Sequence, residues 1–288
     1  EMCIRDSVKA ERPLDPNILA ILATLQAVAT DLGFSYFLVG ATARDVLMTH
    51  VFGLEVQRAT HDVDFAVALE DWPSFDALKR KLIDTGDFES ADGRNHLLRY
   101  KPWEFNNAYP LDLIPFGGIE HKSKEIAWPP DMDVVMNVTG YAEALKSALQ
   151  VDVGNKLVVP VISIPGLAVL KLLAWNDRGL DNNKDAKDLF FLLSCYADAG
   201  NAERLYGEAF SVLEACGFDP SLAGARLLGH DARLILEASS RRAILDVLDD
   251  TAKRERLVTH ILPDRLASPE KAAQLIEQFE QGISSPDL

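Results

Sequence analysis

The first half of the chain alternates between short apolar runs and amphipathic stretches. Apolar runs of strand length that are bounded by turn residues are typical of buried strands, whereas apolar residues spaced three and four apart indicate helices. This pattern predicts strands at 34–39, 62–68, 97–100, 111–115, 134–138, 151–153 and 157–161, and helices at 15–33, 41–48, 73–83 and 141–149. The first half is therefore expected to form a sheet with flanking helices.

From Leu167 onward the pattern is helical almost throughout, with helices at 166–175, from 184 on, and at 203–216, 225–238, 241–249 and 269–279. Pro160 and Pro165 bracket the change in character. We expect an α+β fold with two domains, a sheet domain over 13–162 and an all-helical domain over 163–288. Residues 1–12 are expected to be a disordered or non-native tail.

The bulk composition limits the classes of function. The chain has 288 residues, of which 48% are hydrophobic and 25% charged, as in an ordinary globular protein. No apolar run approaches the roughly 20 residues that a membrane span needs, and the start lacks a secretory signal, so we expect no membrane partner. The three cysteines lack metal-ligand spacing, which favours reduced thiols in the cytoplasm. The net charge of −15 counts against a large nucleic-acid surface.

The clearest candidate chemistry lies at the start of the predicted strand 62–68. Asp62 and Asp64 alternate with Val63 and Phe65, so both carboxylates point to one face of the strand. Their Cα atoms would lie about 6.6 Å apart, close enough to bind one divalent cation together. Such pairs also arise by chance in acidic proteins as solvated strand-end residues.

Two further groups add to this pair. Gly40, Ala41 and Thr42 follow a predicted strand and begin a helix, where unpaired backbone N–H groups can bind an anion. Asp112 interrupts the apolar run 111–115 and would need a cation, a hydrogen-bond partner or a place at the strand's open end. Each has an ordinary alternative, a plain strand-to-helix turn and a strand-end carboxylate.

The predicted helical domain opens with three charged residues on its first two helices. Lys171 interrupts an apolar helix, and Asp185 and Asp188 share one face of the next helix. Lys171 would otherwise extend to solvent, and the acidic residues would simply stabilise the first helical turn.

Together these motifs resemble the nucleotidyltransferase superfamily typified by DNA polymerase β. The run Leu-Val-Gly-Ala-Thr-Ala-Arg-Asp, followed by Arg58-x-Thr60-x-Asp-Val-Asp, looks most like the AbiEii/AbiGii toxin type and also resembles tRNA-end and poly(A) enzymes. The segment Lys171…Lys184-Asp185-x-x-Asp188-Leu189 is similar to elements of those toxins. One departure is Ala41, where the family has a second Gly or a Ser.

The resemblance implies a nucleotidyltransferase-type mixed sheet and transfer of a nucleotide from an NTP to an acceptor hydroxyl. Asp62, Asp64 and Asp112 would hold two Mg²⁺ ions, and Asp112 would be the general base. Gly40, Ala41, Thr42, Arg44 and Lys171 would bind the nucleotide, with Asp185 or Asp188 orienting Lys171 or the acceptor.

The acceptor stays open at this stage: a tRNA end, a small molecule or a protein. A toxin of this type implies a possible cognate antitoxin. Two other classes remain, a catalytically silent NTP- or partner-binding module on the same fold, and a small-ligand α/β protein with chance carboxylates. The histidines have no metal-ligand spacing, and no Ser or Cys lies in a nucleophile motif, so zinc and hydrolase functions are disfavoured.

Overall fold

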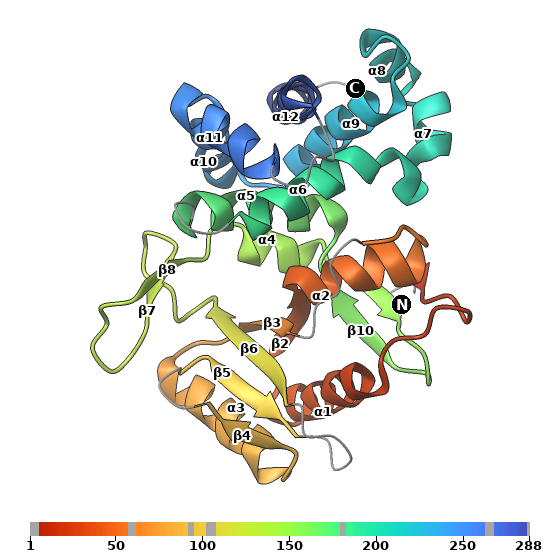
Figure 1. Ribbon diagram of the computed structural model, residues 1–288. Helices are drawn as coiled ribbons and strands as arrows, with labels where there is room; N and C mark the ends of the chain where they lie inside the picture. Colours follow the sequence, from red (N-terminus) through yellow and green to blue (C-terminus); the bar gives the residue numbers. More distant parts are fainter. Residues whose placement is uncertain are drawn as a thin grey trace. The chain divides into compact units, whose positions relative to one another are not determined.

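The computed structural model describes residues 6–56, 62–91, 95–101, 108–178, 183–262 and 268–286. The chain divides into two compact units, Glu1–Ser163 and Ile164–Leu288 (Figure 1). Cys3, Arg58, Thr60 and His61 lie outside the described residues. In the part of the chain that is described, no helix is both long and apolar enough to cross a lipid bilayer.

An eight-stranded mixed sheet organises the first unit (Figure 1). Its strand order is β1-β9-β10-β2-β3-β6-β5-β4. The strands are β1 (Asp6–Ser7), β2 (Ser35–Val39), β3 (Val63–Ala68), β4 (Phe88–Ser90), β5 (Leu97–Tyr100), β6 (Tyr109–Phe116), β9 (Leu149–Asp152) and β10 (Val158–Val161). At the centre, β3 pairs antiparallel with β2 and parallel with β6. A separate hairpin is formed by β7 (Glu125–Ala127) and β8 (Val135–Asn137).

Helices α1 (Pro16–Leu32) and α3 (Trp72–Asp84) pack side by side in this unit. Each begins after an aspartate N-cap and has a proline in its first turn, a strong start signal. Each buries one apolar stripe, which fills the core together with the central strands. Two shorter segments follow strands: α2 (Gly40–Asp45), which continues into the π-helical turn η1 (Val46–Val51), and α4 (Tyr141–Lys146).

The second unit is helical. Its elements are α5 (Ile164–Arg178), α6 (Lys184–Cys195), the π-helical turn η2 (Ala197–Asn201), α7 (Ala202–Tyr206), α8 (Phe210–Ala215), α9 (Pro220–Ile235), α10 (Ala238–Leu248), α11 (Thr251–Ile261) and α12 (Pro269–Ser284). Among the described helices, α9 and α12 have the most extensive contact with each other. Lys271 at the start of α12 forms an ion pair of 2.7 Å with Asp219, the N-cap of α9. Further along, Arg233 of α9 donates to the backbone oxygen of Ile283. The two helices therefore run in the same direction.

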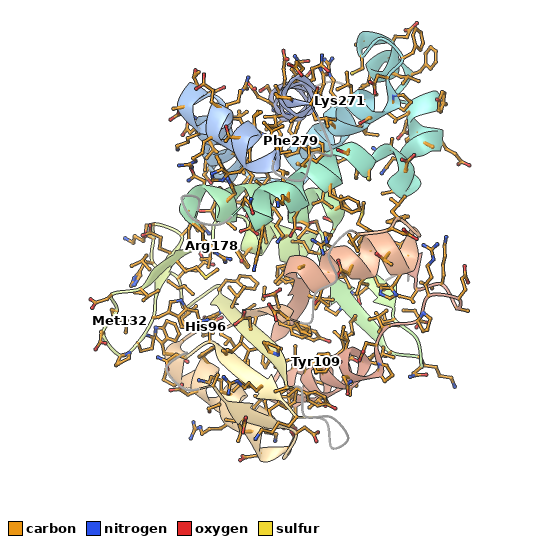
Figure 2. The ribbon with its side chains drawn as sticks, in the orientation of Figure 1. His96, Tyr109, Met132, Arg178, Lys271 and Phe279 are labelled. Carbon is orange, nitrogen blue, oxygen red and sulfur yellow. The ribbon has the colours of Figure 1, made fainter. Side chains whose placement is uncertain are left out.

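Glycines allow α9 and α12 to approach closely beside Phe279, which is fully buried (Figure 2). A Cβ at Gly282 would lie 2.0 Å from the backbone oxygen of Arg226, and one at Gly229 would lie 2.1 Å from the backbone oxygen of Phe279. Because both obstacles are backbone atoms, no side-chain rotation could relieve such a clash.

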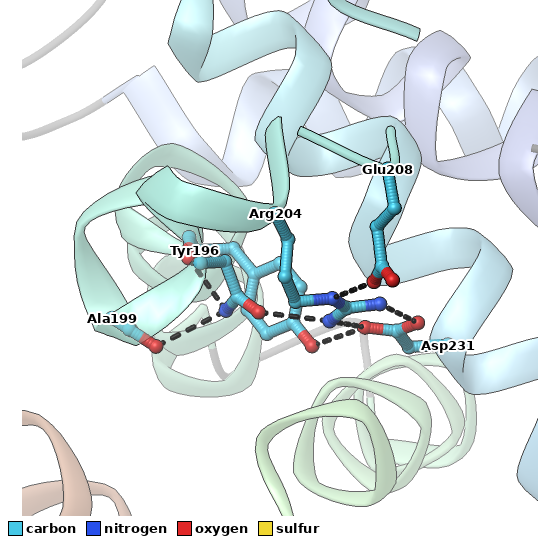
Figure 3. A network of polar contacts seen from close by, with 6 residues as sticks. Tyr196, Ala199, Arg204, Glu208 and Asp231 are labelled. Carbon is cyan, nitrogen blue, oxygen red and sulfur yellow. Dashed lines mark hydrogen bonds and ion pairs between the residues drawn. The ribbon is translucent and has the colours of Figure 1, made fainter. Parts of the chain in front are cut away.

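A polar network joins η2 and α7 to α9 (Figure 3). Both Nη atoms of Arg204 donate to the Asp231 carboxylate, at 2.7 and 2.9 Å. The hydroxyl of Tyr196 donates to the same carboxylate at 2.6 Å. Arg204 also contacts Glu208 and Asn201. Each charged group here has an opposite partner, and the Asp231 carboxylate, which is mostly buried, accepts three hydrogen bonds. We interpret this network as structural.

The structure confirms the expected fold class, a mixed sheet with flanking helices and a helical C-terminal region. It corrects the single helix expected at 203–216, which is divided into α7 and α8 around Gly207. The short strands β4 and β7 were not predicted, and neither was α11, whose charged run buries only Leu257 and Ile261.

Residues 6–12, expected to be a disordered or non-native tail, are ordered. β1 pairs in parallel with β9, and the backbone N–H of Val8 donates to Asp152 at 2.9 Å. The backbone N–H of Lys9 donates to His50 at 2.9 Å. The tail is held through backbone groups at a sheet edge, and such pairing leaves no hydrophobic pattern in the sequence.

We predict that Gly282→Ala lowers the stability of the protein. Alanine normally stabilises a helix by about 0.5–1 kcal/mol relative to glycine. Here the added methyl group would push α12 away from the backbone of α9, so we expect a net loss of about 1–3 kcal/mol in the free energy of unfolding, measured by urea denaturation. Gln274→Ala, at an exposed position of the same helix, is the control and should change stability by less than about 0.5 kcal/mol. A Gly282→Ala protein as stable as the wild type would contradict the packing.

Candidate functional site

The parallel pairing of β3 and β6 brings two of the predicted carboxylates together. In this register Asp64 is directly opposite Asp112. Neighbouring strands lie about 4.8 Å apart, and paired positions of parallel strands point their side chains to the same face. Two acidic residues that are distant in the sequence therefore lie side by side, where their negative charges repel each other unless a cation or donor lies between them.

Asp62 lies one residue before β3, at an exposed position. The hydroxyl of Thr42, which is 2% exposed, donates a short hydrogen bond to the backbone oxygen of Asp62. Thr42 therefore ties the first turn of α2 to the residue that carries the third carboxylate.

Gly40 begins α2 and lies against the carboxylate of Asp64. Its φ angle is +70°, in the left-handed region that favours glycine. A Cβ at this position would lie 2.0 Å from Oδ2 of Asp64 and 2.8 Å from its Cβ. The space beside the Gly40 backbone is thus occupied by the Asp64 side chain, and only glycine permits this approach. The sequence identified Gly40 as a turn residue, and the structure gives the reason.

His96 is a residue of this site that the sequence analysis missed. It immediately precedes β5, and its Nε2 atom lies 3.7 Å from Oδ1 of Asp112. Its backbone oxygen accepts a hydrogen bond of 3.0 Å from the N–H of Leu113, which fixes its position beside β6. A search for metal-ligand spacing could not find it. The available signal was its place next to a strand that could pair with the strand of Asp112.

The donor chemistry of Asp62, Asp64 and Asp112 fits a hard divalent cation, which prefers carboxylate oxygens. Among the described residues, no three His, Cys, Asp or Glu side chains gather closely enough to form a complete metal cage. Mg²⁺ in nucleotide sites usually has one or two carboxylate ligands and completes its shell with phosphate and water. The Asp64–Asp112 pair matches that smaller requirement.

The other predicted residues of the first unit are buried. Ala41 is 8% exposed and offers no polar side-chain atom. Arg44 is 3% exposed, and its Nε and Nη2 donate to Oδ1 of Asp45 at 2.8 and 2.6 Å. Arg44 therefore has an anionic partner inside the protein.

In the second unit Lys171, Asp185 and Asp188 form one buried cluster. The Lys171 Nζ lies 2.9 Å from Oδ1 of Asp185 and 2.7 Å from Oδ2 of Asp188, and all three residues are at most 9% exposed. Burial by itself lowers the pKa of the lysine, but the attraction of Asp188 and Asp185 outweighs it, so the Lys171 pKa is raised. The ammonium group stays charged and links α5 to α6.

We predict that Lys171→Met destabilises the protein by about 3–5 kcal/mol, because it removes the cation that both buried carboxylates contact. Chemical denaturation at pH 7 measures the loss. A raised lysine pKa contributes stability below the unfolded-state pKa of about 10.4 and loses it as the pH rises through the folded-state pKa, so the difference from wild type should shrink only in strongly alkaline solution. Lys184→Met, at an exposed position of α6, is the control. Equal stability of the Lys171 variant and the control variant would contradict this role.

Comparisons with known proteins place these motifs in a family. The family model described as "Nucleotidyl transferase AbiEii toxin, Type IV TA system" matches residues 21–265. No curated protein sequence matches the chain. Among solved structures, an antigenic nucleotidyltransferase-like protein from Paracoccidioides brasiliensis is 16% identical over 72% of this chain and 93% of its own, with a TM-score of 0.42. The antibiotic-resistance factor ANT(2'')-Ia is 13% identical over 71% of this chain and 98% of its own, with a TM-score of 0.38. Because the family match spans most of the chain, this protein belongs to the AbiEii nucleotidyltransferase toxin family.

Proposed function

We propose that this nucleotidyltransferase is Mg²⁺-dependent and transfers NMP from an NTP to an acceptor hydroxyl. The observation that carries the proposal is the pairing of Asp64 with Asp112 beside the backbone of Gly40. Family membership favours an enzyme over a silent binding module.

The nucleotide would approach the turn formed by Gly40, Ala41 and Thr42. The first backbone N–H groups of a helix have no intrahelical acceptor and favour anions. The Asp64 carboxylate lies against this turn, however, and would repel a triphosphate. Bound Mg²⁺ would supply charge neutralisation of the phosphates and lower the pKa of the acceptor hydroxyl. Asp62, Asp64 and Asp112 are the residues that would hold it.

In the reaction, the acceptor oxygen forms a bond to the α-phosphorus of the NTP. The bond from that phosphorus to the bridging oxygen of the β-phosphate breaks, and pyrophosphate leaves with the bonding electrons. The acceptor proton moves to Asp112, which we assign as the general base. In-line displacement of this kind depends mainly on positioning and electrostatic stabilisation.

The remaining residues have supporting roles in this proposal. Thr42 positions Asp62, because its hydroxyl is already donated to the Asp62 backbone oxygen. Arg44 neutralises Asp45 within the same helix. For Lys171 to contact a phosphate, it would have to exchange one of its two carboxylate partners, Asp185 or Asp188, for that phosphate.

There are three candidate acceptors: a tRNA end, a small molecule and a protein. The net charge of −15 disfavours a broad RNA-binding surface, although a short RNA end requires few phosphate contacts. Because the family model describes the toxin of a type IV toxin–antitoxin system, we also propose that a cognate antitoxin exists.

We predict that Asp64→Asn and Asp112→Asn each reduce NMP transfer at least about a hundredfold. Losing several kcal/mol of charge stabilisation in the transition state lowers the rate tenfold for each 1.36 kcal/mol. The assay incubates the protein with each α-labelled NTP, Mg²⁺ and either total tRNA or amine-bearing small molecules, with EDTA as the metal control. Asp76→Asn, an exposed carboxylate on α3, should retain activity. Transfer that survives Asp64→Asn, or that EDTA does not affect, would refute the metal assignment.

Gly40→Ala should abolish transfer, whereas Gly33→Ala should not. Both glycines have φ near +70°, at +70° and +74°, so both substitutions carry a similar backbone strain. Only at Gly40 would the new Cβ collide with the Asp64 carboxylate, since nothing lies within 4 Å of the Cβ position at Gly33. Melting temperatures and transfer rates of the two variants separate strain from displacement of Asp64. Equal activity of the two variants would show that the position of Asp64 does not matter.

A further inference from the structure

A cavity of about 250 Å³ lies in the first unit, next to the site described above. It opens between the turn that precedes β5 and the loop that joins β7 to β8, the two regions marked by His96 and Met132 in Figure 2. Its lining residues are Asn95, His96, Trp128, Pro129, Pro130, Asp131, Asp133 and Val134. No part of it belongs to the carboxylate group already assigned.

The inner wall of the cavity is aromatic and well supported. Trp128 is 9% exposed, and its ring packs at 5.3 Å from Trp72, 5.7 Å from Phe75 and 5.3 Å from His96, measured between ring centroids. The Asn95 amide donates to the backbone oxygen of Pro129, which joins the two sides of the cavity. Lys79 donates to the backbone oxygen of Asn95 at 2.6 Å. The cavity is therefore preformed.

The charges of the lining select the kind of ligand. Asp131 and Asp133 place two carboxylates at exposed positions, and none of the described residues that line the cavity is a lysine or an arginine. A phosphate group would be repelled here, so the cavity is a poor place for the triphosphate or for an RNA backbone. An ammonium group would be attracted by the carboxylates and by the aromatic wall. Trp128, Pro129 and Val134 offer apolar surface to the body of a ring.

His96 connects this cavity to the proposed reaction. It lines the cavity, and its Nε2 atom lies 3.7 Å from Oδ1 of Asp112. A ligand that contacts His96 from the cavity would therefore lie near the proposed general base. Asp112 itself does not line the cavity, so a bound ring would have to extend past His96 for its hydroxyl to reach Asp112, the proposed proton acceptor.

We propose that this cavity is the acceptor subsite and that it takes a hydroxylated ring bearing ammonium groups. The inference rests on the proposed function for the hydroxyl's role, whereas the binding chemistry rests on the cavity alone. It favours a small cationic acceptor over a tRNA end. Asp131 and Asp133 would bind the ammonium groups, and the Trp128 wall would contact the ring.

The test measures binding and transfer separately. The probe is 2-deoxystreptamine, a six-membered ring with hydroxyl and ammonium groups, and myo-inositol is the uncharged control ring. Affinities for the full chain are measured by calorimetry, for the wild type, the Asp131→Asn/Asp133→Asn double variant and Asp84→Asn. Asp84 is an exposed carboxylate that does not line the cavity. The same proteins are assayed for NMP transfer to 2-deoxystreptamine and to total tRNA.

We expect the wild type to bind 2-deoxystreptamine at least tenfold more tightly than myo-inositol, the double variant to lose at least tenfold in affinity, and Asp84→Asn to match the wild type. The tenfold difference is expected because hydrogen bonds between an ammonium group and a carboxylate are about twice as strong as those between neutral groups. Equal affinity for the two rings, or an affinity that the double variant leaves unchanged, would overturn the cavity assignment.

The transfer assay separates the two proposals. Aspartate-dependent binding of the amine without transfer to any acceptor would uphold the cavity's cation specificity and refute the proposed reaction. Transfer to tRNA with the same kcat/KM in the double variant, and no binding of the amine, would uphold the reaction and refute the cavity. Melting temperatures are expected to be unchanged, because both aspartates are exposed.

Discussion

The parallel pairing of β3 with β6 is the interaction on which the candidate site depends. The alignment of the two strands is set by their backbone hydrogen bonds and by the burial of Val63, Phe65 and Val67. Because side chains alternate along a strand, a shift by one residue would turn Asp64 to the opposite face of the sheet. The apolar residues that stabilise the strand thus also fix the direction of its carboxylate.

That register places two negative charges next to each other, and several residues of the first unit lie around them. Asp64 and Asp112 lie side by side, and the first turn of α2 comes against Asp64 through a glycine. The Thr42 hydroxyl donates to the backbone of Asp62, which ties Asp62 to the first turn of α2. His96, which precedes β5, lies beside Asp112 of β6. An anionic cluster of this kind is a suitable place for a divalent cation and an unsuitable one for an unaccompanied phosphate. The proposed dependence on Mg²⁺ follows from this arrangement.

In the helical unit, clustered carboxylates are neutralised by lysine and arginine side chains of the protein itself. Lys171 lies between Asp185 and Asp188, and Arg204 lies against Asp231 and Glu208. In both clusters each charge has an opposite partner, and the charges around Lys171 are the buried ones, for which an isolated charge would be very costly. The first unit differs in that two acidic residues, Asp64 and Asp112, lie at paired positions of neighbouring strands.

The sequence by itself determined much of this protein. Periodicity predicted the central strands and the amphipathic helices, and the motifs around Gly40, Asp62 and Asp64 indicated the family, because strand alternation and helix spacing are local properties. It missed α11 and the break at Gly207, where charge runs or a single glycine override the pattern. The tertiary structure alone decided that Asp64 faces Asp112, that Lys171 is enclosed by two aspartates, and that His96 and Trp128 form one wall. Those contacts join residues far apart in the chain, and strand pairing and packing, which no local pattern encodes, bring them together.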